Sequence, residues 1–383
     1  MPSEQSVGMM AWEPFPYVHS VVLNRLKLGL SLVFAVWAVS LAVAGADGLE
    51  RLNEQSQTSR QQVEIPIAIR RLENNTKALA VPVTVAGQSL ELHLDTGSTG
   101  VRVLAEAIDP EMVVRTGERT QATFFDGTVF EGEIAIASIS IGPITTTEPI
   151  AIHLVDSVRC PAENPDCFDA YQQAGMSGVL GLSMGARTGG SSFEIYSPIS
   201  RLPENFQSGY IVGTRGFYAV DGSLTLGLTP DSLAGFWQAS LPLRQMEPTI
   251  FPDGSSIWQD DALTVNHSLQ GDGIPPEFQD LAGRTLFDSG TAHTVLGVDR
   301  EPSFSARLWP GAVLTSQLED GLSWQLQAGN TLSLSQVFVR GVERSPQHIL
   351  GLPFFFNYEV AFNRRDGAIG FKPIGTTPSS ATL

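Results

Sequence analysis

The chain has 383 residues, of which 42% are hydrophobic and 16% are charged, so it can fold as one large or two ordinary domains with a substantial core. This composition excludes an intrinsically disordered chain. Asp and Glu total 40 against 23 Lys and Arg, and the resulting net charge of -17 argues against binding to nucleic acid.

A long apolar run lies near the start of the chain. Residues 28–46 carry no charge and follow Arg25 and Lys27, a pattern typical of export signals. Alanines spaced as A-x-A near the end of the run favour cleavage, whereas its length and the long leader favour an uncleaved anchor. Residues 1–46 are therefore predicted to be a signal peptide or a signal anchor. The rest of the chain is expected outside the cytoplasm, secreted, periplasmic or membrane-anchored, and only an uncleaved run would contact a membrane.

Strand patterns begin after the leader. Residues 47–62 are polar without a sustained period, so we expect a polar linker or a short prosegment. Apolar residues then alternate with other residues at 63–69, at 81–85 and at 90–94. This period of two is typical of strands with one buried face, and the short stretches between them predict turns. We therefore predict a three-stranded meander that ends at Asp95.

The pattern at the end of this meander returns later in the chain. The sequence DTG begins at Asp95 and the sequence DSG begins at Asp288, each after a short apolar stretch. Each aspartate is followed downstream by two apolar residues and a glycine, VLG ending at Gly181 and ILG ending at Gly351. A glycine at that point lets a second strand pack closely beside the turn. The repeated order indicates internal duplication, and we expect the two aspartates to meet.

Helix signals are few. The candidates are residues 166–176 and 229–238, the second with Pro230 in its first turn. The remainder is typical of short strands and turns without alternating helices, which predicts a mostly β fold. A glycine-rich passage at 208–216 suggests the seam between two halves. The predicted divisions are an N-terminal lobe at 63–212, a C-terminal lobe at 213–374 and a flexible tail at 375–383.

The chain has two cysteines, Cys160 and Cys167. In an exported protein this pair predicts a disulfide that closes a small loop, and the alternative is a pair of reduced thiols. Two thiolates without a nearby histidine at ligand spacing are too few for a metal site, so none is expected.

Five elements, in their order along the chain, resemble the pepsin-like aspartic proteases, peptidase family A1. The resemblance covers roughly residues 63–373. The elements are DTGS at 95–98, a hairpin flap around 124–132, GVLGLS at 178–183, DSGT at 288–291 and ILGLPFFFNYEVAFNRRDGAIGF at 349–371.

The resemblance implies a bilobal fold of two duplicated β-barrel-like lobes with a cleft between them. It also implies that Asp95 and Asp288 form a catalytic dyad in that cleft. Two carboxyl groups within a few Å cannot both ionise cheaply, so the pair shares one proton and activates a water. The implied function is that of an aspartic endopeptidase, with apolar residues flanking the scissile peptide bond.

Residues beside the two aspartates would support the dyad. By resemblance, Thr96 and Ser289 would tie the two turns together, and Ser98 and Thr291 would hydrogen-bond the outer carboxylate oxygens. The resemblance further implies a peptide or protein substrate, a monomer, and neither a cofactor nor a metal. The supporting residues are Thr96, Gly97, Ser98, Ser289, Gly290 and Thr291.

The chain departs from the pepsin pattern at two positions. In the predicted flap, where Phe125, Asp126 and Gly127 lie, Phe125 occupies the position of the usual tyrosine. Arg102 occupies the position of the tryptophan that normally follows the first motif. In pepsins these two side chains hydrogen-bond each other. Arg102 could attract an acidic group of a substrate, or it could pair with a neighbouring carboxylate.

The departures leave a second function open. A protein with this fold could bind peptides or another protein without cutting them, and the presence of both aspartates favours the enzyme. His93 and His293 flank the two aspartates, and we interpret both as structural residues and not as catalytic ones.

Overall fold

The computed structural model describes residues 62–375, except 74, 163, 186–194, 246, 300–304, 308–310, 320, 329–336 and 342–347. The predicted signal segment at 1–46, nearly all of the predicted linker and the end of the tail lie outside the described residues. Within those residues, no helix is long and apolar enough to span a membrane. Strands predominate over short helices, which confirms the mostly β fold class.

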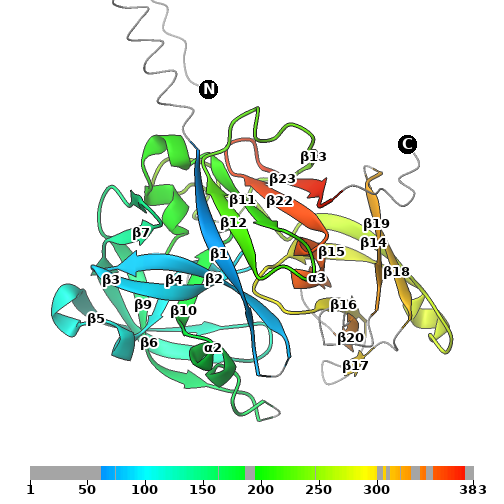
Figure 1. Ribbon diagram of the computed structural model, residues 1–383, viewed down its shortest axis with the longest axis horizontal. Coiled ribbons are helices and arrows are strands. Elements are labelled where there is room, and N and C mark those ends of the chain that lie inside the picture. The colour runs from blue at the N-terminus through cyan, green and yellow to red at the C-terminus, as the bar shows by residue number, and fades with distance from the viewer. Residues whose placement is uncertain are drawn as a thin grey trace, which may run out of the picture. The chain divides into compact units, whose positions relative to one another are not determined.

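Fifteen of the described strands form the first sheet, shown in Figure 1. Its main order is β13-β23-β22-β11-β12-β1-β2-β3-β10-β4-β9-β6-β5, with β7 attached to β2 and β8 attached to β7. The strands are β1 (Val63–Arg71), β2 (Lys77–Val85), β3 (Gln88–Asp95), β4 (Thr99–Leu104), β5 (Val114–Thr123), β6 (Val129–Ala137), β7 (Ile139–Ile141), β8 (Ile144–Thr145), β9 (Ile150–Arg159), β10 (Met176–Leu182), β11 (Gly209–Thr214), β12 (Asp221–Leu226), β13 (Trp237–Ser240), β22 (Tyr358–Asn363) and β23 (Ala368–Pro373).

The second sheet of the described residues has eight strands in the order β17-β20-β16-β21-β15-β14-β18-β19. They are β14 (Leu263–Gln270), β15 (Asp280–Phe287), β16 (Thr294–Val298), β17 (Ser305–Arg307), β18 (Val313–Leu318), β19 (Ser323–Gln327), β20 (Val337–Gly341) and β21 (His348–Leu350). The helices of the described part of the chain are α2 (Asp169–Gln173) and α3 (Leu352–Phe355), with 3-10 turns at Ala105–Ala107, Pro110–Met112, Pro198–Arg201, Glu204–Phe206 and Pro276–Phe278.

The first three strands form the predicted meander. β1 pairs antiparallel with β2, and β2 pairs antiparallel with β3. In β1, Ile65, Ile67 and Ile69 are buried while the residues between them are more exposed, as the period of two predicts. Leu92 and Leu94 of β3 join the same core. Burial on this face therefore fixes the strand that ends at Asp95.

The ends of β3 and β15 are built in the same way. β3 pairs in parallel with β10, which pairs antiparallel with β4; β15 pairs in parallel with β21, which pairs antiparallel with β16. A Cβ on Gly181 would lie 2.8 Å from the carbonyl oxygen of Gly100, and one on Gly351 would lie 2.1 Å from that of His293. Both glycines are required by close backbone approach. The shared arrangement confirms the predicted duplication.

Strands from both ends of the described chain meet in the first sheet. β11 lies between β12 and β22, and β12 also pairs with β1. β11 makes up most of the glycine-rich passage at 208–216. The predicted lobe boundary between residues 212 and 213 therefore falls inside this strand. Gly209 serves packing there, because a Cβ on it would lie 2.1 Å from the carbonyl oxygen of Phe362.

The helix predicted at 229–238 is wrong. Only one turn forms, in which the Leu233 N–H donates to the Thr229 carbonyl at 3.2 Å, and the strand β13 begins at Trp237. Gly235 has φ 80°, a left-handed conformation that ends the turn. The proline and the polar residues before it favour a helix start, but the glycine stops propagation within a few residues.

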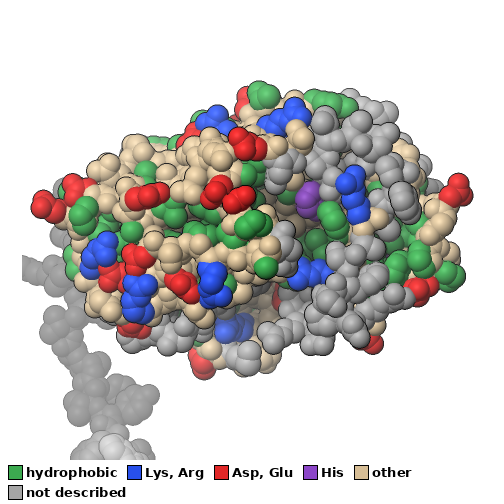
Figure 2. Space-filling view, turned by 90° about the horizontal axis from the view of Figure 1, so that it is seen from below, with side chains coloured by type: hydrophobic (Ala, Val, Ile, Leu, Met, Phe, Trp, Pro, Cys, Tyr) green, Lys and Arg blue, Asp and Glu red, His purple; other side chains and the backbone are tan. Residues whose placement is uncertain are grey.

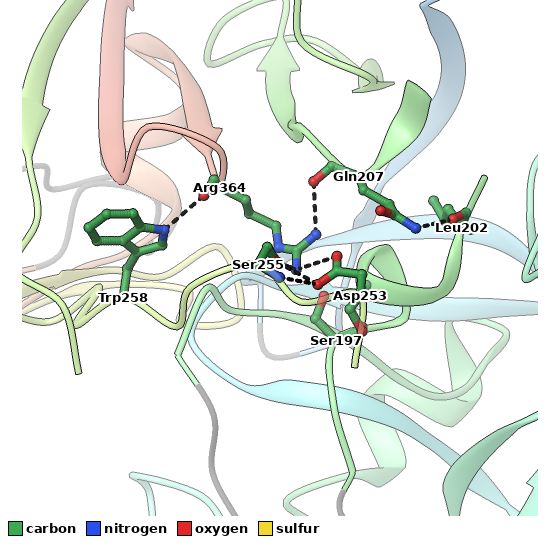
Figure 3. A network of polar contacts seen from close by, with 8 residues as sticks. Ser197, Leu202, Gln207, Asp253, Ser255, Trp258 and Arg364 are labelled. Atoms are coloured by element: carbon green, nitrogen blue, oxygen red, sulfur yellow. Dashed lines mark hydrogen bonds and ion pairs between the residues drawn. The ribbon is translucent and has the colours of Figure 1, made fainter. Parts of the chain in front are cut away.

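A buried arginine anchors the segment that precedes β14, as Figure 3 shows. Arg364 Nη2 lies 3.2 Å from Asp253 Oδ2 and donates to Ser255 Oγ at 2.9 Å. Its Nη1 donates to the Gln207 carbonyl at 2.8 Å, and its own carbonyl accepts the Trp258 indole N–H at 2.8 Å. Both charged side chains are nearly inaccessible, and such burial is tolerated because they are paired and hydrogen-bonded.

Cys160 and Cys167 form a disulfide, which confirms the predicted bond. The bond closes the loop between β9 and α2. Phe168, next to the second cysteine, is buried against Phe130 of β6, with ring centroids 5.0 Å apart. The closed loop therefore holds α2 against the strand that forms one side of the flap hairpin.

Candidate active site

Asp95 and Asp288 come from the two duplicated turns and meet. Asp95 is the last residue of β3, Asp288 follows β15, and both carboxyl groups are buried, at 5% and 8% exposure. A Cβ on Gly97 would lie 2.5 Å from Asp288 Cγ, and a Cβ on Gly290 would lie 2.6 Å from Asp95 Cγ. Each turn therefore presents a bare glycine to the carboxyl group of the other turn.

Backbone and hydroxyl donors hold both carboxyl groups. Asp95 Oδ1 accepts the N–H of Gly97 at 2.8 Å and that of Ser98 at 3.0 Å. Asp288 Oδ1 accepts the N–H of Gly290 at 2.8 Å, and its Oδ2 accepts the hydroxyl of Thr291 at 2.6 Å. The contact of Ser98 differs from the prediction, because its backbone N–H bonds the carboxylate while its hydroxyl accepts from Arg102 at 3.5 Å.

Thr96 and Ser289 connect the two turns through a buried set of four hydrogen bonds. The Thr96 hydroxyl donates to the Phe287 carbonyl at 2.8 Å and accepts the Ser289 N–H at 2.9 Å. The Ser289 hydroxyl donates to the Leu94 carbonyl at 2.8 Å and accepts the Thr96 N–H at 3.1 Å. Each hydroxyl thus satisfies a donor and an acceptor of the other turn, which fixes the approach of the two aspartates.

Burial, and then the charge of Asp95, raise the pKa of Asp288 well above the usual range of a carboxyl group. The hydrogen bonds from Thr291 and Gly290 oppose this rise because they favour the charged form. Two carboxyl groups this close titrate as a pair, and burial keeps one proton on the pair over a wider pH range than a free carboxyl group would hold it.

The tip of the hairpin between β5 and β6 lines the same cavity as the two aspartates. The N–H and the hydroxyl of Thr128 both donate to the carboxylate of Asp126 at 2.9 Å, and Gly127 has φ 91°. These features give the tight turn that the flap needs. Phe125 is 39% exposed, and Arg340 of β20 contacts it twice: Nη1 donates to its carbonyl at 3.3 Å, and the guanidinium lies 4.7 Å from its ring centroid.

Arg102 is buried in β4. Its Nη1 donates to the Ser98 hydroxyl and, at 3.4 Å, to the Gly100 carbonyl, and its guanidinium lies 5.6 Å from the ring centroid of Phe124. Arg102 does not line the cavity that the described residues form around the aspartates. It therefore supports the base of the flap and the first turn from behind, and its pairing with a carboxylate stays a prediction.

A cavity of about 400 Å³ contains both aspartates. Figure 2 shows one face of the molecule, on which a histidine lies beside hydrophobic and basic side chains. Among the residues described, no three His, Cys, Asp or Glu side chains are arranged to hold a metal ion. The side chains around the aspartates are a mixture of aromatic and polar groups. The cavity is lined by Thr76, His93, Phe124, Phe125, Asp126, Thr128, Phe130, Asn164, Cys167, Phe168, Tyr171, Val179, Thr291, Ala292, His293, Val295, Phe338 and Arg340, with Gly290 and the aspartates.

Sequence reasoning missed several of these residues. Phe168 and Tyr171 are three positions apart near the start of α2, and their rings stack at 5.4 Å between centroids. This spacing could have indicated one apolar face of a short helix. Nothing in the sequence pointed to Arg340, because its strand β20 shows only an ordinary alternation of buried and half-buried residues. Its place beside Phe125 depends on how the flap and β20 approach each other.

No protein-family model matches the chain, and no curated protein shows significant sequence similarity to it. Among solved structures, it is similar to the crystal structure of the aspartic proteinase from Irpex lacteus, with a TM-score of 0.54 and 16% sequence identity. The match covers 84% of this chain and 100% of that one. At this identity the similarity concerns the fold. Together with the duplicated turns, it shows that the chain has the bilobal pepsin-like fold.

Proposed function

We propose that the protein is an aspartic-type endopeptidase in which Asp95 and Asp288 act as one catalytic pair. The observation that carries the proposal is the meeting of the two turns, each with a glycine against the opposite carboxyl group. Two buried carboxyl groups in contact cost stability, and the surrounding hydrogen bonds hold them there. A functional role explains this arrangement better than a structural one.

The pair supplies a base and an acid. The raised pKa of Asp288 favours the shared proton on that residue, so Asp95 takes a proton from the attacking water. Two backbone N–H groups donate to Asp95 Oδ1 and hold this carboxyl group in position. Asp288 protonates the carbonyl oxygen as the water adds to the carbonyl carbon. When the carbon–nitrogen bond breaks, Asp95 passes its proton to the leaving nitrogen and Asp288 recovers one from the hydroxyl.

The substrate is an extended peptide with apolar side chains beside the scissile bond. The cavity that contains the aspartates supports this proposal, since Phe124, Phe168, Tyr171 and Phe338 contribute to its lining. Aromatic walls with a few polar groups are typical of sites that bind apolar side chains while hydrogen bonds orient the backbone.

We further propose that the protein works outside the cytoplasm, either released or anchored through residues 28–46. The disulfide between Cys160 and Cys167 supports an oxidising compartment. Fractionation of cells that express a C-terminally tagged full chain tests this proposal. Recovery of the tag from the exported or membrane fraction is expected, and a wholly cytoplasmic tag would contradict it.

Cleavage of an unfolded protein by purified chain tests the activity. Wild type should release fragments, and Asp288→Asn should lower the rate by at least about a thousandfold because it removes the shared proton system. Asp280→Asn is the matched control, because it makes the same change at an exposed residue of the preceding strand and should cleave like wild type. A transition-state-mimicking inhibitor should block wild type.

A non-catalytic binding protein is the second candidate. It is favoured by Phe125, which has no hydroxyl group, and by the two contacts that hold it to Arg340. A chain that binds peptides but releases no fragments at any pH, while its folding is intact, would establish this function in place of the first.

A further inference from the structure

His93 lies between the two halves of the candidate active site. It is two residues before Asp95 in β3 and is 5% exposed. Its Nδ1 lies 3.3 Å from the Leu79 carbonyl oxygen, and its Nε2 lies 3.2 Å from the Gly290 carbonyl oxygen. One ring therefore connects β2 with the turn that carries Asp288.

Both ring nitrogens face acceptors. A neutral imidazole has one N–H and one lone pair, so it can donate to only one of the two carbonyl groups. The other nitrogen would then direct its lone pair at a buried carbonyl oxygen. The imidazolium form has two N–H groups and satisfies both.

The Gly290 carbonyl belongs to a peptide group that orients Asp288. The other end of this peptide is the Thr291 N–H, which donates to the Asp288 carbonyl at 3.2 Å. On either side of it, the Gly290 N–H and the Thr291 hydroxyl donate to the two carboxylate oxygens. A rotation of this peptide would displace both donors. A hydrogen bond that holds its carbonyl oxygen in place therefore also holds the Asp288 carboxyl group in place.

We infer that His93 is a positioning residue that, as an imidazolium ion, ties the Asp288 turn to β2 and thereby couples the geometry of the dyad to acid pH. The inference rests on the proposed protease function and adds a second titrating group to it. The ring touches a carbonyl group of the Asp288 turn and acts on Asp288 only through that turn.

The groups around His93 shift its pKa in opposite directions. Burial lowers its pKa, while Asp95 and the two carbonyl groups raise it, and the net result is a lowered pKa. The ring of Tyr171 of α2 contacts the imidazole in a tilted arrangement, with centroids 4.9 Å apart and 56° between the ring planes, and Asp288 lies on the facing turn. The other charged or titratable groups that line the cavity are Asp126, His293 and Arg340. His93 therefore gains its proton only in acid and loses one of its two bonds as the pH rises.

Two variants separate the charge of His93 from its shape. His93→Gln keeps an N–H donor for the Gly290 carbonyl at every pH, and His93→Leu removes both bonds and places an apolar side chain at the same position. His93→Leu should lower kcat about tenfold, with KM changed less than about threefold, as expected for one or two lost hydrogen bonds. His93→Gln should recover most of kcat. His267→Leu, which removes a buried imidazole of the second sheet, should leave kcat within about twofold.

The pH profile tests the role of the charge. Activity of His93→Gln should persist to higher pH than activity of wild type, because only the dyad then titrates. An unchanged kcat in His93→Leu, or an upper pH limit that is the same in wild type and His93→Gln, would overturn the inference.

Nitrogen-15 NMR of labelled histidines tests the inference without activity. The signals that vanish in His93→Gln should show two protonated nitrogens in acid and one at neutral pH. A single protonated nitrogen throughout the acid range would also overturn it. If wild type cleaves nothing but these signals behave as expected, the proposed function fails while the imidazolium bridge stands.

Discussion

Thr96 and Ser289 are joined across the candidate active site by two reciprocal hydrogen bonds. The Thr96 hydroxyl accepts the Ser289 N–H at 2.9 Å, and the Ser289 hydroxyl accepts the Thr96 N–H at 3.1 Å. Both residues are fully buried. Because the two residues lie on different copies of the repeat, this reciprocal pair determines how closely Asp95 and Asp288 approach.

Replacing Thr96 with valine should destabilise the protein by roughly 1–3 kcal/mol. The new side chain has nearly the same shape, but it leaves the Ser289 N–H and the Phe287 carbonyl buried without this partner. Chemical denaturation measures the loss. Thr84→Val, at a half-buried position of β2, is the control and should change stability by less than about 0.5 kcal/mol. Equal stability of the two variants would show that the link is not needed.

Asp288→Asn should stabilise the fold at neutral pH. A carboxyl group whose pKa is raised on folding contributes stability below its unfolded pKa, and this contribution is lost as the pH rises through the folded pKa. The amide cannot ionise, so the gain in melting temperature over wild type should be large near pH 7 and small near about pH 4. A gain that does not depend on pH would contradict the raised pKa. Asp280→Asn should show no such trend.

The contact between Arg340 and Phe125 should hold the flap closed. Arg340→Gln removes the charge over the ring and weakens the bond to the Phe125 carbonyl, so amide hydrogens of residues 124–128 should exchange several-fold faster. Arg307→Gln, at an exposed position of the neighbouring strand β17, should leave exchange in the flap unchanged. Unchanged exchange in Arg340→Gln would show that other contacts hold the flap.

A buried histidine pair should limit stability in acid. The rings of His267 and His348 meet edge to face at 4.7 Å, and burial lowers the pKa of both, that of His348 to about 4. A lowered histidine pKa gives stability that is complete above the unfolded value, about 6.5, and is lost as the pH falls toward the folded value.

His348→Gln should therefore lose less melting temperature than wild type between about pH 6.5 and about pH 4. The glutamine oxygen can still accept the Gly297 N–H that Nδ1 of His348 accepts at 3.1 Å. His293→Gln, at a half-buried position, is the control for the general effect of replacing a histidine with glutamine. Parallel acid losses in wild type and His348→Gln would exclude His348 as the cause.

The sequence predicted the parts of this fold that depend on local pattern. The alternation in β1 to β3 specified one buried face, and the repeated aspartate and glycine positions specified two equivalent turns because close backbone approach admits only glycine there. Sequence signals for the start of a helix were less informative. At Thr229 a helix start is followed within a few residues by Gly235, so the local signal did not become a helix.

The surroundings of the aspartates depended on contacts between distant segments. From the sequence, His93 resembles any residue on the face of an alternating strand that points away from the core, until the Gly290 carbonyl, 197 positions away, is seen beside it. Arg340 acquires its role only because the flap tip reaches β20. The pattern of one strand cannot show which residue of another will face it, so such residues emerged only from the structure.

The pH dependence of peptide hydrolysis tests the central claim most directly. The claim is that Asp95 and Asp288 share one proton and together cut peptide bonds. Rates on an unfolded protein, measured from about pH 3 to about pH 8, should rise and fall with two pKa values for wild type. They should collapse at every pH in both Asp95→Asn and Asp288→Asn. Hydrolysis that survives in either variant, or none by folded wild type at any pH, would contradict the claim.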